Sequence, residues 1–77
     1  MENEIQLLKL NHDDKARISS INGGQTLTSR LRAMGIYPGA VVKKMLSPSR
    51  GPVVIEVLNS KVAIGRGMAE KIMVKKI

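Results

Sequence analysis

The stretch from Arg30 to Gly39, RLRAMGIYPG, constrains the fold of this chain more than any other segment. Gly35 stands where the C-terminal cap of a helix needs a left-handed backbone. Pro38 and Gly39 then suit the two central positions of a type II turn, because proline fixes φ and glycine accepts a positive φ. The segment therefore predicts a helix that stops and a chain that reverses twice before a strand begins.

The helix predicted before this stop has one apolar face. Leu27, Leu31 and Met34 lie at i, i+4 and i+7, so their side chains share one side of a helix that starts near Gln25. Ile36, just after the stop, can pack back on Leu31, which is the contact expected of a Schellman closure.

The rest of the chain reads mainly as short strands. Alternating or apolar segments separated by turn residues predict five of them: Lys15–Ile21, Ala40–Leu46, Pro52–Leu58, Val62–Gly65 and Lys71–Ile77. The segment Ile5–Leu10 is apolar but too short to classify. We expect a single domain over residues 1–77, mainly β, in which about five strands curl into a small barrel. One short α-helix between the first and second strands would plug an open end of this barrel.

Within the strands, alternation predicts which side chains face the core. Val53, Ile55 and Val57 are expected inside with Glu56 outside, and the other strands follow the same rule. Asn59 and Ser60 are expected to separate two strands, as are the SPSRG segment and a tight turn over residues 66–70.

Composition limits the class of protein. The 77 residues include no cysteine and no apolar run near the roughly 20 residues that span a bilayer. The N-terminus begins with acidic residues and lacks a secretory signal, so we expect a cytoplasmic protein with no membrane insertion. The net charge of +7 favours attraction to nucleic acid, anionic lipid or an acidic protein surface. The paired lysines, such as Lys43 with Lys44, are interpreted as solvated outer faces of strands.

The sequence offers little to catalysis or metal binding. His12, Asp13 and Asp14 form the one cluster of potential metal ligands, and we interpret them as a polar turn because three adjacent residues rarely converge on an ion. The Gly65–Gly67 segment lacks the third glycine of a dinucleotide fingerprint, and the chain has no Walker lysine. We expect no enzymatic activity, no resident metal and no cofactor.

These elements together resemble the FeoA family, small cytoplasmic partners of the bacterial ferrous-iron transporter that share an SH3-like barrel. The resemblance rests on residues spread over most of the chain: Arg30, Leu31, Met34, Gly35, Ile36, Pro38, Gly39, Gly51, Pro52, Val62, Ala63, Ile64, Gly65, Arg66, Met68, Ala69, Ile72 and Val74. It implies an SH3-like fold and an accessory role in ferrous-iron uptake through an FeoB-type membrane transporter, at or near its GTP-binding region.

The resemblance also suggests where such a partner would bind. An apolar patch between helix and barrel would comprise Leu27, Leu31, Met34, Ile36 and Tyr37. Core packing is an equal explanation for Leu31. Arginines near turns that could reach a partner's nucleotide site are Arg32, Arg50 and Arg66.

Two other classes of function stay open. A small nucleic-acid-binding barrel agrees with the charge, although Tyr37 is the single aromatic residue and single-strand readers rely on stacking platforms. A regulatory SH3-like module is the other alternative, and no helix-turn-helix segment accompanies it here. The sequence leaves the oligomeric state open.

Overall fold

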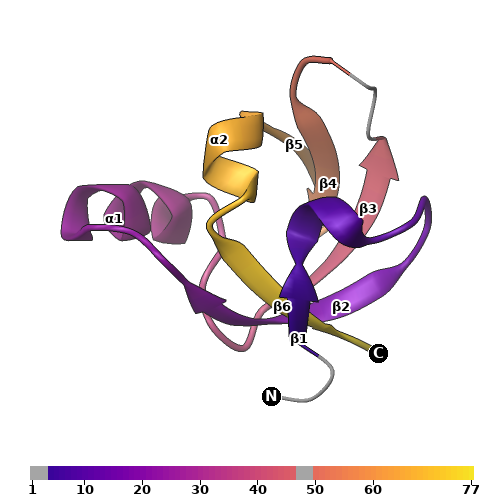
Figure 1. The fold of residues 1–77 in the computed structure, drawn as a ribbon, viewed down its shortest axis with the longest axis horizontal. Helices are drawn as coiled ribbons and strands as arrows, with labels where there is room; N and C mark the ends of the chain where they lie inside the picture. The colour runs from indigo at the N-terminus through magenta and orange to yellow at the C-terminus, as the bar shows by residue number, and fades with distance from the viewer. Residues whose placement is uncertain (1–3, 47–49) are drawn as a thin grey trace.

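A computed structural model describes residues 4–46 and 50–77 (Figure 1). The elements in chain order are β1 (Glu4–Gln6), the 3₁₀ helix η1 (Leu7–Lys9), β2 (Lys15–Ile21), α1 (Gln25–Ala33), β3 (Val41–Leu46), β4 (Val53–Val57), β5 (Ser60–Ile64), α2 (Arg66–Ala69) and β6 (Ile72–Lys76). The strands form one antiparallel sheet in the order β1-β6-β2-β3-β4-β5. The predicted mainly β architecture with one short helix before β3 is confirmed.

The strand count and one turn differ from the prediction. The described residues form six strands, because Glu4–Gln6 pairs with β6 although it is too short to show periodicity. The turn between β4 and β5 consists of Leu58 and Asn59, and Ser60 already belongs to β5. The expected turn over residues 66–70 contains the one-turn helix α2. Most of the predicted SPSRG turn lies outside the described residues.

The core lies on the concave side of the curled sheet. Val53, Ile55 and Val57 are buried on β4, with the half-buried Glu56 on the other face, as the alternation predicts. The full set of buried apolar residues comes from nearly every element: Leu7, Leu10, Ala16, Ile18, Leu31, Ile36, Val42, Val53, Ile55, Val57, Ile64, Ala69, Ile72 and Val74. Burial of this apolar set is the main driving force for the fold.

Strand β3 contains one exception to the expected polar exterior. Lys44 is only 2% exposed, so the interpretation of Lys43 and Lys44 as a solvated pair is wrong for Lys44. The reason is the strand period of two, which places Lys44 on the same inner face as Val42.

Helix α1 does not plug the barrel. In Figure 1 it projects to one side of the sheet, and Leu31 is its single buried residue. The two short helices η1 and α2 instead lie against each other. Because α1 is anchored through its last turn, most of its side chains stay available at the surface.

Candidate functional site

The end of α1 has the closure that the sequence predicts. The amide of Ile36 donates a hydrogen bond to the Leu31 carbonyl at 2.9 Å, and the amide of Gly35 donates to Arg32 at 3.0 Å. Gly35 has a φ of +86°, which glycine adopts without steric cost. This pair of bonds is the Schellman motif, and it fixes the direction in which the chain leaves the helix.

The type II turn predicted over Pro38 and Gly39 is also confirmed. Ala40 donates its amide hydrogen to the Tyr37 carbonyl at 3.0 Å, and Gly39 has a φ of +98°. Two further bonds of 2.8 Å join the turn to β2: Gly39 donates to Ile18, and Ile18 donates to Ala40. The turn is therefore held against the sheet rather than extending freely from it.

The five residues predicted to bind a partner separate into buried and accessible groups. Leu31 and Ile36 are 0% exposed and belong to the core, so they support this surface from inside. Leu27 is half-buried, while Met34 and Tyr37 are each 37% exposed. Of the predicted patch, only these last three offer accessible apolar surface.

A pocket of about 230 Å³ lies beside this turn, lined by Ile21, Thr28, Arg32, Ile36, Tyr37 and Pro38. The Arg32 guanidinium stands over the Tyr37 ring, 5.8 Å from its centroid, in a cation-π arrangement. The tyrosine therefore presents both a hydrophobic ring and an adjacent positive charge to an approaching molecule.

The other two candidate arginines have different settings. Arg50 is exposed at the start of the second described range. Arg66 is half-buried at the beginning of α2, and its charge helps to lower the pKa of Lys44. The three arginines thus lie on different parts of the chain: Arg32 on α1, Arg50 between β3 and β4, and Arg66 on α2.

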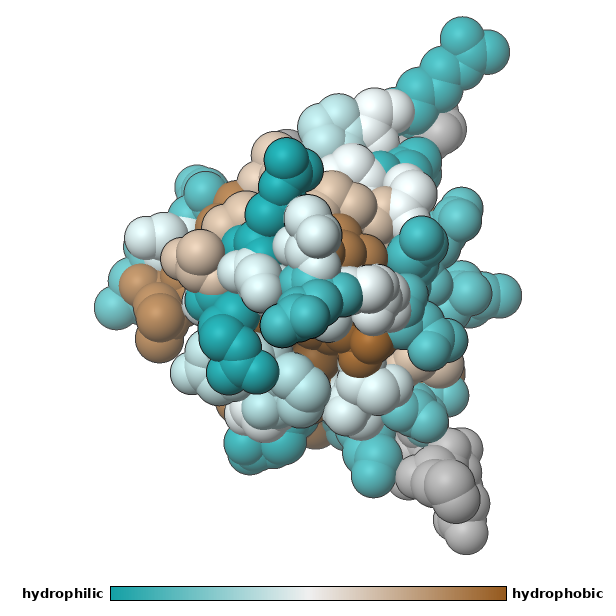
Figure 2. All heavy atoms as spheres, turned by 90° about the vertical axis from the view of Figure 1, so that its left-hand side faces the viewer, coloured by the Kyte–Doolittle hydropathy of each residue, from teal (hydrophilic) through white to brown (hydrophobic). Residues whose placement is uncertain are grey.

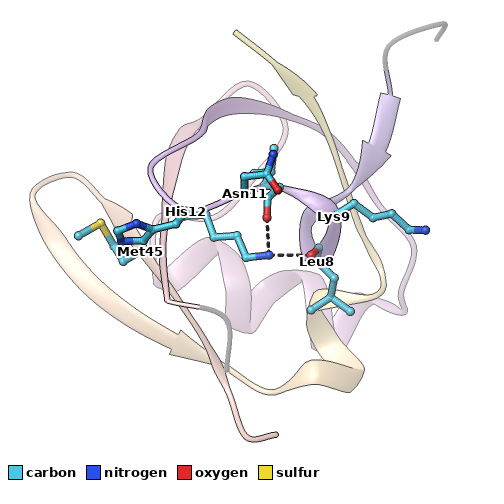
Figure 3. A pocket seen from close by; sticks show the side chains of 7 residues that line it. Leu8, Lys9, Asn11, His12 and Met45 are labelled. Atoms are coloured by element: carbon cyan, nitrogen blue, oxygen red, sulfur yellow. Dashed lines mark hydrogen bonds between the residues drawn. The ribbon is translucent and has the colours of Figure 1, made fainter. Parts of the chain in front are cut away.

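A larger hollow, of about 480 Å³, surrounds the end of η1 (Figure 3). Its lining residues are Leu8, Lys9, Leu10, Asn11, His12, Lys44 and Met45. In Figure 3 His12 and Met45 are seen at one edge of the pocket, and the side chain of Lys9 points away at the opposite edge.

The ammonium group of Lys44 makes the polar contacts of this hollow. It donates hydrogen bonds to the carbonyl oxygens of Leu8 at 2.6 Å and Leu10 at 2.7 Å, the dashed lines of Figure 3. Burial lowers the pKa of Lys44, and the nearby Arg66 charge lowers it further, while Asp14 acts in the opposite direction. The lysine thus satisfies the open carbonyls at the end of η1, which is a structural role.

The polar loop before β2 uses its carboxylates within the protein. Asp13 lies 3.6 Å from His12 and 3.7 Å from Lys43. Asp14 accepts a hydrogen bond of 2.9 Å from the Asn11 amide and pairs with Lys76 at 3.3 Å. In residues 4–46 and 50–77, no three histidine, cysteine, aspartate or glutamate side chains gather where they could hold a metal ion. The arrangement is that of a capped turn.

Besides the C-terminal Ile77, two accessible apolar residues were not predicted from the sequence. Leu58 is 78% exposed and Val41 is 43% exposed. Leu58 is preceded by the alternating strand Val53–Val57, which made it look like the last strand residue. The sequence could have indicated this exposure through the pair Leu58–Asn59, which stands between two strands. The side chains of a two-residue hairpin turn generally face solvent.

The face that carries α1 is mixed in character. Figure 2 shows hydrophobic side chains interspersed with many hydrophilic ones over this face, rather than one continuous apolar area. Such a surface favours contact through a few apolar anchors surrounded by charges.

The chain is similar to known proteins in both sequence and fold. The family described as FeoA domain matches residues 5–76. A protein of Methanocaldococcus jannaschii described as Fe(2+) transport protein A is 41% identical over 58 residues, which are 75% of this chain and 70% of the relative.

Solved structures show the same fold. A crystal structure described as iron uptake regulatory protein (FeoA) superimposes with a TM-score of 0.91 at 34% identity, over 96% of this chain and 99% of that one. The Stenotrophomonas maltophilia FeoA, described as a procaryotic SH3 domain protein complexed with zinc, gives a TM-score of 0.78 at 21% identity, over 92% and 89% of the two chains. The predicted SH3-like fold is thereby confirmed.

Proposed function

This chain belongs to the FeoA domain family, and from that premise we propose that it is a non-enzymatic accessory protein of ferrous-iron uptake. In this proposal it acts in the cytoplasm, binds the cytosolic GTP-binding region of an FeoB-type transporter and supports the activity of that transporter. Ferrous iron is the cargo of the transporter rather than a resident ligand of this chain.

One observation carries the proposal: the family match extends over residues 5–76, nearly the entire chain. The matched region therefore includes α1, the turn after it and nearly all of the strands. The name of the Methanocaldococcus jannaschii relative assigns that protein to Fe(2+) transport, which also supports the proposed role in ferrous-iron uptake.

The surface beside the turn supports a role in protein binding. Met34 and Tyr37 offer apolar area on a rigid base, since Leu31 and Ile36 beneath them are fully buried. Aromatic side chains with an adjacent arginine, such as Tyr37 with Arg32, are frequent energetic centres of protein interfaces.

No helix within the described residues has the length and apolarity needed to cross a membrane.

The test is a titration of isotope-labelled chain with the purified cytosolic GTP-binding domain of the transporter, and separately with duplex DNA at two salt concentrations. We expect chemical-shift changes with the protein partner that include Met34 and Tyr37. Silence with that partner, together with salt-sensitive shifts at Lys43, Lys75 and Lys76 on adding DNA, would instead assign the chain to the nucleic-acid-binding class.

A narrower hypothesis concerns GTP hydrolysis. An arginine supplied to the nucleotide site of the partner would stabilise the charge that develops on the transferring phosphoryl group. Arg32 and Arg50 are exposed, whereas Arg66 is half-buried, so the first two are better placed for this role. Arg32→Ala and Arg50→Ala should then slow GTP hydrolysis by the transporter domain in complex with this chain. Equal rates with both variants and the unaltered chain would dispose of the hypothesis.

A further inference from the structure

The turn between β4 and β5 holds a large apolar residue in an unfavourable backbone conformation. Leu58 and Asn59 connect the paired residues Val57 and Ser60, with φ values of +50° and +67°. Two consecutive positive φ angles define a type I′ turn, whose first central position favours asparagine, aspartate or glycine. Leucine is disfavoured there because its Cβ crowds the backbone.

The side chain of Leu58 contributes little to the stability of the fold. Its side chain is 78% exposed, so it removes little apolar surface from water. Asparagine at the same place would adopt the conformation more easily and would suit solvent better. A leucine that is unfavourable both for its backbone and for its exposure points to a role in contact with another molecule.

Other accessible apolar residues surround Leu58. The antiparallel register Lys43↔Glu56, continued by two residues, places Val41 beside Leu58. The two line a shallow groove of about 180 Å³ with Lys15, Val42, Lys43, Glu56 and Asn59. A Cβ added to Gly35 would lie 3.4 Å from Leu58 Cδ1, so the groove adjoins the end of α1.

Charged residues around the groove are mostly basic. Sheet pairing aligns Lys15, Lys43, Glu56 and Lys61 across four strands, and Arg17 pairs with Val41. The alternation in β2 and β3 places these side chains on the outer face, opposite the core. Two basic residues, Lys15 and Lys43, thus line the groove beside the acidic Glu56, and Asp13 pairs with Lys43. The next basic residues in the sheet are Lys61 and Arg17, whose guanidinium also donates a hydrogen bond of 3.1 Å to the Gly39 carbonyl.

We propose that Leu58 and Val41 are the apolar anchor that receives an acidic, amphipathic segment of the transporter's cytosolic region. An apolar side chain of that segment would occupy the groove, and its carboxylates would face Lys15, Lys43 and Arg17. This inference rests on the proposed function and adds a second contact surface to the one beside the turn after α1. The excess of positive charge around the groove selects an acidic partner.

Two variants of the turn separate binding from folding. Leu58→Asn removes the anchor and relieves the backbone, while the matched control Asn59→Gly relieves the backbone at the next position and keeps the anchor. Both should melt at the same temperature as the unaltered chain or a few degrees higher. Only Leu58→Asn should weaken binding to the purified GTP-binding domain, by roughly ten- to a hundredfold, the effect of losing one buried leucine.

Affinity is measured by calorimetry with the unaltered chain and both variants, and melting by circular dichroism. If the unaltered chain binds and Leu58→Asn binds equally well, the groove is not the docking surface, although the proposed function stands. If the unaltered chain does not bind at all, both fail. Concentration-dependent self-association that Leu58→Asn abolishes, detected by sedimentation of the chain alone, would assign the groove to a second copy and overturn the proposal.

Discussion

The ammonium group of Lys44 lies 2.7 Å from the backbone carbonyl oxygen of Leu10, and this bond joins β3 to the residue after η1 across 34 positions of sequence. Lys44 is 2% exposed, and its ammonium group also donates a hydrogen bond to the Leu8 carbonyl oxygen. A 3₁₀ helix of three residues has too few internal bonds to persist alone. Lys44 therefore fastens the N-terminal segment to the barrel.

Replacement of Lys44 should destabilise the protein to an extent that depends on the volume retained. Lys44→Met keeps most of the packing but leaves two carbonyls without this donor, so we expect a loss of about 1–3 kcal/mol in the free energy of unfolding. Lys44→Ala also opens a cavity and should lose more. Urea denaturation measures both. A Lys44→Met variant as stable as the original would show that the desolvation cost of the ammonium cancels its hydrogen bonds.

Gly35 should tolerate no side chain. At its φ of +86°, an alanine Cβ would lie 3.1 Å from Val57 Cγ1, so Gly35→Ala combines backbone strain with a tight contact. We expect a loss of about 1–2 kcal/mol or more, which for a domain of this size lowers the melting temperature by roughly 4–8 °C per kcal/mol.

The matched control for this prediction is Gly67→Ala. Gly67 lies within α2, its φ is not positive, and a Cβ there would meet no atom within 4 Å. Alanine is favoured over glycine in a helix, so this variant should be neutral or stabilised by about 0.5–1 kcal/mol. Equal losses from Gly35→Ala and Gly67→Ala would contradict the role assigned to the left-handed cap.

Truncation to alanine should lower the stability of the protein at Leu31 but not at Met34. Leu31 is 0% exposed, so Leu31→Ala should lower the free energy of unfolding by about 2–5 kcal/mol. This loss is comparable with the total stability of roughly 3–5 kcal/mol expected for so small a domain. Leu31→Met, which keeps the volume, should cost less than about 1.5 kcal/mol and remain folded. Met34→Ala at the surface should leave stability almost unchanged. Thermal melts distinguish these outcomes, and a strong destabilisation by Met34→Ala would place that residue in the core.

Lowering the pH should reduce the stability that Asp14 gives to the loop before β2. The hydrogen bond from the Asn11 amide, with help from Lys76, holds the pKa of Asp14 below its ordinary value of 3.8. Because the folded pKa is lowered, the unfolded chain binds the proton more readily. The stabilisation is therefore complete well above pH 3.8 and is lost as the pH falls through the folded pKa.

The comparison of the original chain with Asp14→Asn tests this linkage. Their difference in unfolding free energy, measured by urea denaturation at several pH values, should be largest near neutral pH and shrink below pH 3.8. A difference that stays constant over that range would mean that the carboxylate charge contributes nothing to the loop.

The sequence alone determined the features that depend on a few adjacent residues. The Schellman closure at Gly35 and the type II turn at Pro38 and Gly39 follow from the φ angles that glycine and proline allow. The inward positions on β4 follow from the strand period of two. Local stereochemistry and periodicity act over a few residues, and for that reason they can be read without the fold.

The tertiary structure decided the features that depend on distant segments. The burial of Lys44 requires the carbonyls of Leu8 and Leu10, which only the folded chain brings to it. The same folding divides the predicted patch into buried Leu31 and Ile36 and exposed Tyr37. Solvent exposure depends on every neighbour of a side chain in space, so no local pattern could have assigned it.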